Sequence, residues 1–277
     1  IGNGTFRSCH SLSSIDIPSG VTTIGDDTFS DCYSLSSIEI PSGVTSIGVS
    51  AFTNCSSLGE NGWEQSFNDI KIFSDFLHNK FPNCPHYILG FSLGSFLVRE
   101  YLNKCDHNFS GAIIAGTGYQ PNILLSIMIA IVKTQINTYG FDSPTPLVNQ
   151  LSFETYNAKF KPNNTVFDWL CSDEQELHKY ISDTLCTDSI SAGLFYQLLN
   201  SLKYTGRKDA YVNYDKDLPI LLLYGEKDPV GNFGKGIMSV EKAMKKAGLT
   251  NSKTYLFSNA RHDIFHEINS GCTNQVV

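Results

Sequence analysis

The chain has 277 residues, of which 41% are hydrophobic and 17% charged, so it can bury a core and has the composition of a globular protein. Its formal net charge of -7 at pH 7 and the absence of a basic stripe argue against a nucleic-acid-binding surface. Its longest apolar run, residues 123–132, is too short to span a bilayer, so we expect at most peripheral contact with membranes.

The eight cysteines are spread along the chain and include no C-x-x-C pair. This spacing favours reduced thiols in an intracellular protein over a disulfide framework or a zinc site. The sequence calls for no metal and no cofactor. The chain starts at Ile1, with no initiator Met and no signal peptide, so we expect a cytoplasmic protein and leave open whether residues precede Ile1.

Residues 1–58 form a repeat array with a period of 23 residues. Residues 11–33 (SLSSIDIPSGVTTIGDDTFSDCY) align without gaps with residues 34–56 (SLSSIEIPSGVTSIGVSAFTNCS). Each unit predicts two short strands, and its recurring apolar side chains would point into a solenoid core. Cysteines recur at the same spacing and fit small buried hydrophobes of stacked units, at Cys9, Cys32 and Cys55.

This array resembles the leucine-rich repeats of BspA-like surface proteins. The resemblance implies a short solenoid that can bind a protein partner. About three or more units are usually needed for a stable solenoid, and only two are complete here. We therefore interpret residues 1–58 as the end of an array or as a graft onto a second domain.

The composition changes at Gly59, where we place the start of a second domain, residues 59–277. Apolar residues between Trp63 and Leu77 recur at helical spacing and predict a helix of about five turns. Beyond it, apolar strand-like runs alternate with helical patterns, which predicts an α/β fold with a parallel sheet. The expected strands are residues 87–89, 111–117, 219–224 and 253–257, and a further helix is expected over residues 236–247.

A motif with a catalytic geometry follows the first of these strands. Residues 90–94 read GFSLG, and this G-x-S-x-G pattern between a strand and a helix is typical of a nucleophile elbow. Ser92 would sit at the apex of a strained turn, and Gly90 and Gly94 would let the strand and helix approach closely. The alternative is a chance match, which the strand before the motif and the amphipathic helix after it disfavour.

Two later strand ends carry the residues that such a serine needs. A base must take the serine proton, and an acid must orient and stabilise the resulting imidazolium. Asp228 follows the strand at residues 219–224, and His262 follows the strand at residues 253–257. The order Ser92, Asp228, His262 is the order expected for this fold.

Other residues compete for the same roles. Glu226 lies two residues before Asp228, Asp263 adjoins His262, and His266 follows one helical turn later. We favour Asp228 as the acid and His262 as the base from their placement at strand ends.

Residues 59–267 resemble the monoacylglycerol lipase/lysophospholipase branch of the α/β-hydrolases. The matching stretches are NGWEQSFNDI, HYILGFSLGSFLVREYL, CSDEQELHKYISDTLCT, LLLYGEKDPVG and ARHDIFHE. The resemblance implies that Ser92 is the nucleophile, Asp228 the acid and His262 the base. It also implies that the backbone N–H of Leu93 donates one oxyanion hydrogen bond.

The resemblance further implies that residues 119–205 form a helical cap over the substrate. Within them, residues 123–132 fit an apolar lid helix or an ordinary buried cap helix equally well. Family members carry several strands and a second oxyanion donor before the helix that starts near Trp63, and the repeats occupy that place here. We therefore expect a truncated hydrolase sheet whose Ser92 strand lies at an edge, with the short repeat strands as candidates to cover it.

The favoured function is a serine hydrolase that cleaves carboxylic esters of a monoacylglycerol or lysophospholipid. Loss of one oxyanion donor typically lowers turnover by about 10²–10³-fold, so the missing part would impair the enzyme. The alternative is a repeat-bearing interaction or surface protein with an inactive hydrolase remnant. A peptidase or haloperoxidase on the same scaffold stays open, because a fold does not fix its chemistry.

Overall fold

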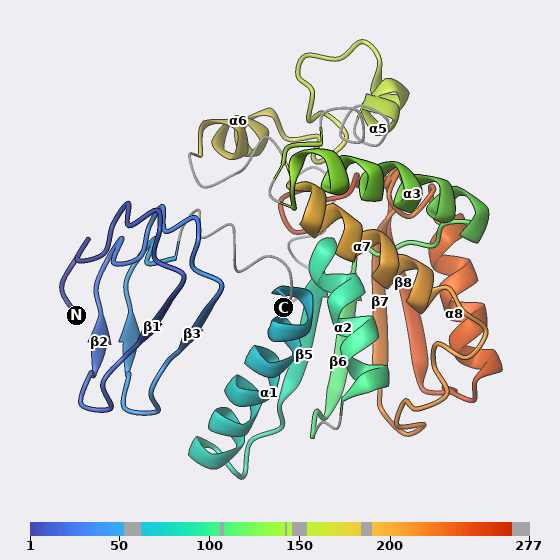
Figure 1. Ribbon diagram of the computed structural model, residues 1–277. Coiled ribbons are helices and arrows are strands. Elements are labelled where there is room, and N and C mark those ends of the chain that lie inside the picture. Colours follow the sequence, from blue (N-terminus) through green and yellow to red (C-terminus); the bar gives the residue numbers. More distant parts are fainter. Residues whose placement is uncertain (53–61, 106–107, 142, 146–153, 184–189, 268–277) are drawn as a thin grey trace.

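The computed structural model describes residues 1–52, 62–105, 108–141, 143–145, 154–183 and 190–267 (Figure 1). Its larger part is built on a four-stranded parallel sheet in the order β5-β6-β7-β8. The strands are β5 (Tyr87–Phe91), β6 (Gly111–Ala115), β7 (Ile220–Gly225) and β8 (Ser252–Phe257). The predicted α/β class with a parallel sheet is confirmed.

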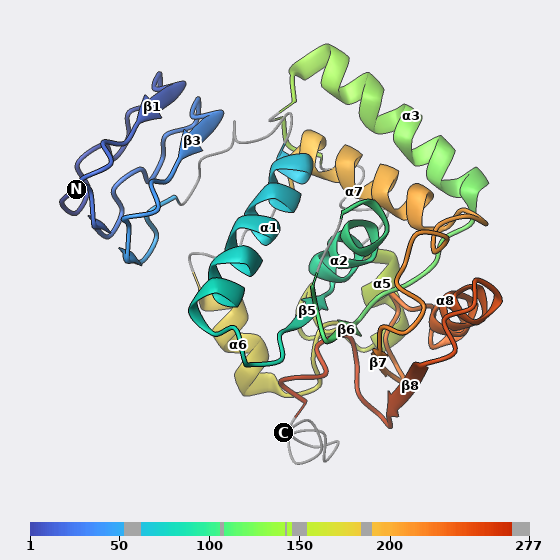
Figure 2. The same ribbon diagram turned by 90° about the horizontal axis from the view of Figure 1, so that it is seen from below.

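Helices cover one face of this sheet. They are α1 (Gly62–Lys80), α2 (Leu93–Lys104) and α8 (Lys235–Lys246), and Figure 2 shows α1 and α2 side by side. Side chains alternate between the faces of a strand, so every second residue of β6 and β7 meets α2 and α8. The main buried members of this core are Val98, Leu102, Ala112, Ile114, Ile220, Leu222, Ile237, Val240 and Met244.

The opposite face of the sheet is less covered. Leu89, Ile113 and Leu221 are register partners on three neighbouring strands, and the side chain of Leu89 is 51% exposed. Tyr87 is largely exposed and Tyr255 is partly exposed. Parallel sheets normally bury both faces, so the described residues leave part of this sheet open.

β5 lies at the edge of the sheet, as the sequence predicts. The suggestion that the repeat strands cover this edge is wrong for the described residues. β1 (Ser14–Asp16) pairs with β3 (Ser37–Glu39), and β2 (Thr23–Ile24) pairs with β4 (Ser46–Ile47). The repeat strands therefore pair with their equivalents in the next unit, because the sequence period places identical apolar patterns side by side.

The repeat units also stack through their side chains. The rings of Phe6, Phe29 and Phe52 are nearly parallel, with centroids 5.2 and 5.3 Å apart. Cys32 is buried and its thiol donates to the carbonyl oxygen of Phe6 at 3.1 Å, which fits the role expected of the recurring cysteines. Cys9 is exposed instead, and Cys55 lies outside the described residues. A complete solenoid stays a prediction.

The segment between β6 and β7 is helical and gathers at one end of the sheet (Figure 1). It contains α3 (Asn122–Tyr139), α5 (Thr155–Asn157), the 3₁₀ turn η2 (Ala158–Phe160), α6 (Glu174–Ser182) and α7 (Ala192–Thr205). α3 packs on α7 through buried Leu125 and Val132, while Ile123 is 80% exposed. Helix α3 is thus neither fully buried nor fully exposed. No described helix is long and apolar enough to cross a bilayer.

Candidate active site

Ser92 occupies the tight turn between β5 and α2. Its backbone has φ 50° and ψ -119°, a positive φ that is unfavourable for a residue with a side chain. The turn is held because Ser92 N donates to Ala115 O at 3.0 Å and Ser95 N donates to Ser92 O at 2.9 Å. The strained apex expected from the G-x-S-x-G motif is therefore present.

The two glycines of the motif differ in their importance. A Cβ on Gly90 would lie 2.4 Å from Gly94 O and 2.8 Å from a methyl carbon of Val98, so only glycine fits at position 90. A Cβ on Gly94 would meet nothing within 4 Å. The expected close approach of strand and helix thus explains Gly90, and the prediction that Gly94 is needed for the same reason is wrong.

The structure brings His262 and Asp228 to this serine. His262 Nε2 lies 2.8 Å from Ser92 Oγ, and His262 Nδ1 lies 3.0 Å from Asp228 Oδ1. Both His262 and Asp228 are fully buried. Asp228 Oδ1 also accepts a hydrogen bond from Val230 N at 2.8 Å, which orients the carboxylate. This arrangement fits the neutral tautomer with its proton on Nδ1, which leaves Nε2 free to accept the serine proton.

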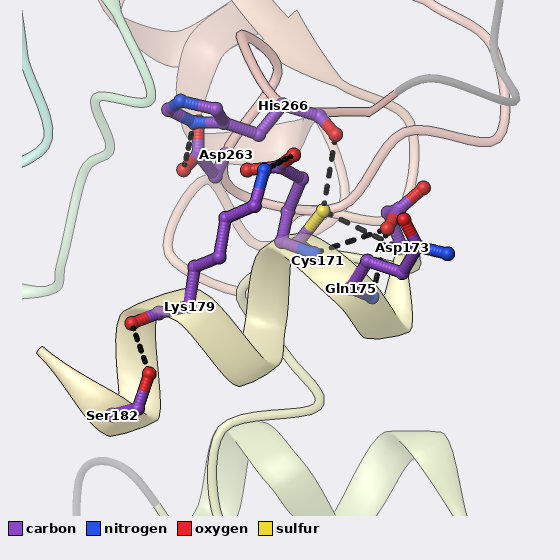
Figure 3. A network of polar contacts seen from close by, with 8 residues as sticks. Cys171, Asp173, Gln175, Lys179, Ser182, Asp263 and His266 are labelled. Atoms are coloured by element: carbon purple, nitrogen blue, oxygen red, sulfur yellow. Dashed lines mark hydrogen bonds and ion pairs between the residues drawn. The ribbon is translucent and has the colours of Figure 1, made fainter.

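The competing residues point elsewhere. Glu226 Oε2 accepts a hydrogen bond from Asn259 N at 2.8 Å. Asp263 Oδ2 pairs with His266 Nδ1 at 2.8 Å on the surface, as Figure 3 shows. Neither pair involves Ser92.

Aromatic side chains surround the imidazole of His262. The ring centroids of Phe91 and Trp169 each lie 5.2 Å from that of His262, and Tyr156 packs on Trp169 at 5.4 Å. Burial raises the pKa of Tyr156 to about 12, and the negative charge of Asp228 adds to the shift. Sequence reasoning missed Tyr156 and Trp169 because isolated aromatic residues in a helical segment carry no motif.

The position of Leu93 suits a donor to an oxyanion. It is the first residue of α2, where backbone N–H groups have no partner inside the helix and the helix dipole is positive. Within the described part of the chain, no group of three or more His, Cys, Asp or Glu side chains is arranged to hold a metal ion.

Two family models match the chain, and their matches overlap over residues 56–84. The family described as serine aminopeptidase, S33, matches residues 56–269. The BspA-type leucine-rich repeat region, with six copies, matches residues 1–84 and so extends past the predicted boundary at residue 58 into α1. A comparison with curated proteins gives no match.

Solved structures share the fold of this chain. A thermostable carboxyl esterase from Bacillus coagulans in complex with glycerol has a TM-score of 0.67 and 20% identity, over 74% of this chain and 66% of that one. A lipase in an open form has a TM-score of 0.63 and 22% identity, over 78% of this chain and 70% of that one. The monoacylglycerol lipase of Paleococcus ferrophilus has a TM-score of 0.55 and 17% identity, over 77% of this chain and 72% of that one. The chain thus spans about two thirds of the first of these proteins.

Proposed function

The chain belongs to the serine aminopeptidase S33 family of α/β-hydrolases, and from this premise we propose that it is a serine hydrolase acting on carboxylic esters of small lipids. The observation that carries the proposal is the pair of short contacts that link Ser92 to His262 and His262 to Asp228. A buried imidazole between a hydroxyl and a carboxylate is the arrangement that activates a serine nucleophile.

In the proposed mechanism, Ser92 Oγ attacks the ester carbonyl carbon while His262 Nε2 takes the hydroxyl proton. Asp228 accepts the Nδ1–H hydrogen bond and stabilises the imidazolium that forms. The N–H of Leu93 donates to the carbonyl oxygen as it gains negative charge. His262 then protonates the leaving alcohol, and a water molecule that His262 deprotonates releases the acyl group from Ser92 as a carboxylic acid.

The substrate class rests on two observations. Esterases and lipases are among the solved structures that share the fold. In addition, the cap helix α3 exposes Ile123, Leu124 and Ile127 at its start, which suits contact with an acyl chain or a lipid aggregate. We therefore propose a monoacylglycerol or lysophospholipid as the substrate.

A second candidate function is a protein-interaction role. It is favoured by the described sheet, which has only four strands and carries β5 at its edge. In that alternative, the repeats bind a protein partner and the hydrolase part is inactive. For the hydrolase, the cytoplasm remains the proposed location.

Hydrolysis assays with matched variants separate these functions. We expect turnover of a monoacylglycerol or lysophosphatidylcholine by the wild type and a fall of more than about 10³-fold in kcat/KM for Ser92→Ala. Ser239→Ala is the control, because this hydroxyl is exposed on α8 and donates only to Lys235 O in the described contacts. Absence of turnover by folded wild type favours the interaction protein, and turnover of an alanine p-nitroanilide in place of the esters assigns a peptidase.

A further inference from the structure

The turn that carries His262 is joined to the cap by a buried carboxylate. Glu267 is 1% exposed, and its Oε1 accepts hydrogen bonds from Arg261 N at 2.8 Å and from Ser172 N at 3.0 Å. Its Oε2 accepts a further hydrogen bond from Ser172 Oγ. Arg261 directly precedes His262, so this one side chain connects the base-bearing turn to the start of α6.

Further contacts run along the same seam between residues 168–172 and residues 261–267. His262 N donates to Trp169 O at 3.4 Å, and Asp263 N donates to Leu170 O at 2.7 Å. The guanidinium of Arg261 donates to Asp168 O and to Cys171 O. The Cys171 thiol donates to His266 O at 3.4 Å, as Figure 3 shows.

Two of these contacts join backbone groups on both sides, and two come from the guanidinium of Arg261, whereas Glu267 contributes a buried negative charge. A carboxylate loses its hydration when it is buried, and this loss is unfavourable unless hydrogen bonds replace the water. Glu267 meets that condition by accepting from two N–H groups and one hydroxyl. Charge-assisted hydrogen bonds are shorter and stronger than neutral ones, so Glu267 holds the geometry of the turn more firmly than a neutral side chain would.

We propose that Glu267 is a positioning residue that fixes the imidazole of His262 by holding its turn against the cap segment at Ser172. The effect on turnover rests on the proposed function. Glu267 touches neither Ser92 nor Asp228 in the described contacts, so it acts on catalysis through the position of His262. A displacement of about 1 Å at a catalytic group lowers turnover by about 10²-fold. Loss of the Glu267 carboxylate therefore lowers kcat while KM stays nearly unchanged.

Three variants and one control test the proposal by kcat, KM and folding. Glu267→Ala removes the three described hydrogen bonds and should lower kcat by about 10–100-fold, with KM within about twofold. Glu267→Gln keeps an acceptor oxygen and should restore kcat to within about fivefold of wild type. Ser172→Ala removes only the hydroxyl and should lower kcat by less than Glu267→Ala; if Glu267→Ala does not fold, this variant and Glu267→Gln carry the test.

Asp173→Ala is the matched control. Asp173 Oδ1 accepts from Gln175 N and Glu176 N at the start of α6, one residue from Ser172, but it makes no described contact with the His262 turn. We expect its kcat to stay within twofold of wild type. Equal losses in Asp173→Ala and Glu267→Ala would mean that the cap is merely destabilised and would overturn the proposal.

A readout that needs no turnover separates this inference from the proposed function. The Nδ1–H that His262 donates to Asp228 is followed by proton NMR as a downfield signal. Glu267→Ala should shift or broaden this signal, and Asp173→Ala should leave it in place. An unchanged signal in Glu267→Ala contradicts the positioning role, whereas a shifted signal in a protein without hydrolysis contradicts only the proposed function.

Discussion

His262 Nε2 lies 2.8 Å from Ser92 Oγ, although 170 positions separate the two residues in the sequence. The sheet explains this approach. Ser92 follows β5 and His262 follows β8, and the carboxyl ends of parallel strands lie along one edge of a sheet. The imidazole then reaches the serine across the ends of β6 and β7, and residues of the intervening loops set its position.

Gly116 is one of these residues. It has φ +58°, and a Cβ there would lie 3.0 Å from His262 Cε1 and 2.9 Å from Phe91 Cε2. Gly116→Ala should therefore displace the imidazole and lower kcat by more than about tenfold. Gly140→Ala is the matched control, since Gly140 also has a positive φ but a Cβ there would meet nothing within 4 Å. Both variants should lose about 1–3 kcal/mol of stability, because each places a side chain at a positive φ, and equal kcat values for the two would contradict this account.

Arg99 is predicted to stabilise the packing of α2. Its guanidinium is almost fully buried and donates to Thr117 Oγ1, Gly118 O, Thr205 O and Tyr211 OH at 2.7–3.3 Å. Arg99→Met would leave buried acceptors without donors, so the free energy of unfolding should fall by about 3 kcal/mol or more in urea denaturation. Arg207→Met should change it by less than about 1 kcal/mol, because Arg207 pairs with Asp209 on the surface. A loss below 1 kcal/mol for Arg99→Met would refute the prediction.

The Cys171 thiol should resist alkylation in the folded protein. Burial raises its pKa to about 12, and nearby carboxylates, Glu267 first among them, add to the shift. Only the thiolate reacts, so at pH 8 the thiolate fraction is very small and rises only as the pH approaches 12. Mass spectrometry after iodoacetamide treatment should show Cys84, which is exposed, modified more than about 100-fold faster than Cys171. Unfolding in urea should remove this difference, and comparable rates in the native protein would show that Cys171 is accessible.

Phe29 is predicted to stabilise the repeat array. It is fully buried and its ring stacks between Phe6 and Phe52. Phe29→Ala should lower the stability of the array by about 3–5 kcal/mol, because the truncation leaves a cavity. Val49→Ala, at a largely exposed position, is the control and should change stability by less than about 0.5 kcal/mol. Similar unfolding transitions for both variants would contradict the assigned core.

The sequence predicted the strands and the approach of Ser92, Asp228 and His262 because each signal is local. Apolar runs mark β5 to β8, Ser92 directly follows β5, and Asp228 and His262 lie in the loops that follow β7 and β8. It did not predict that Trp169 packs on His262 or that Glu267 reaches Ser172, because these contacts depend on how the cap folds back over the sheet. The motif also led us to expect a close approach at Gly94, but a Cβ at this position would meet nothing within 4 Å.

The most direct test of the central claim is the site of covalent labelling by a fluorophosphonate. If Ser92, His262 and Asp228 act together, peptide mapping should find the adduct on Ser92 in the wild type. His262→Ala should slow the labelling by more than about 10³-fold, and Ser92→Ala should abolish it. An adduct on another residue, or labelling of Ser92 at an undiminished rate in His262→Ala, would contradict the account.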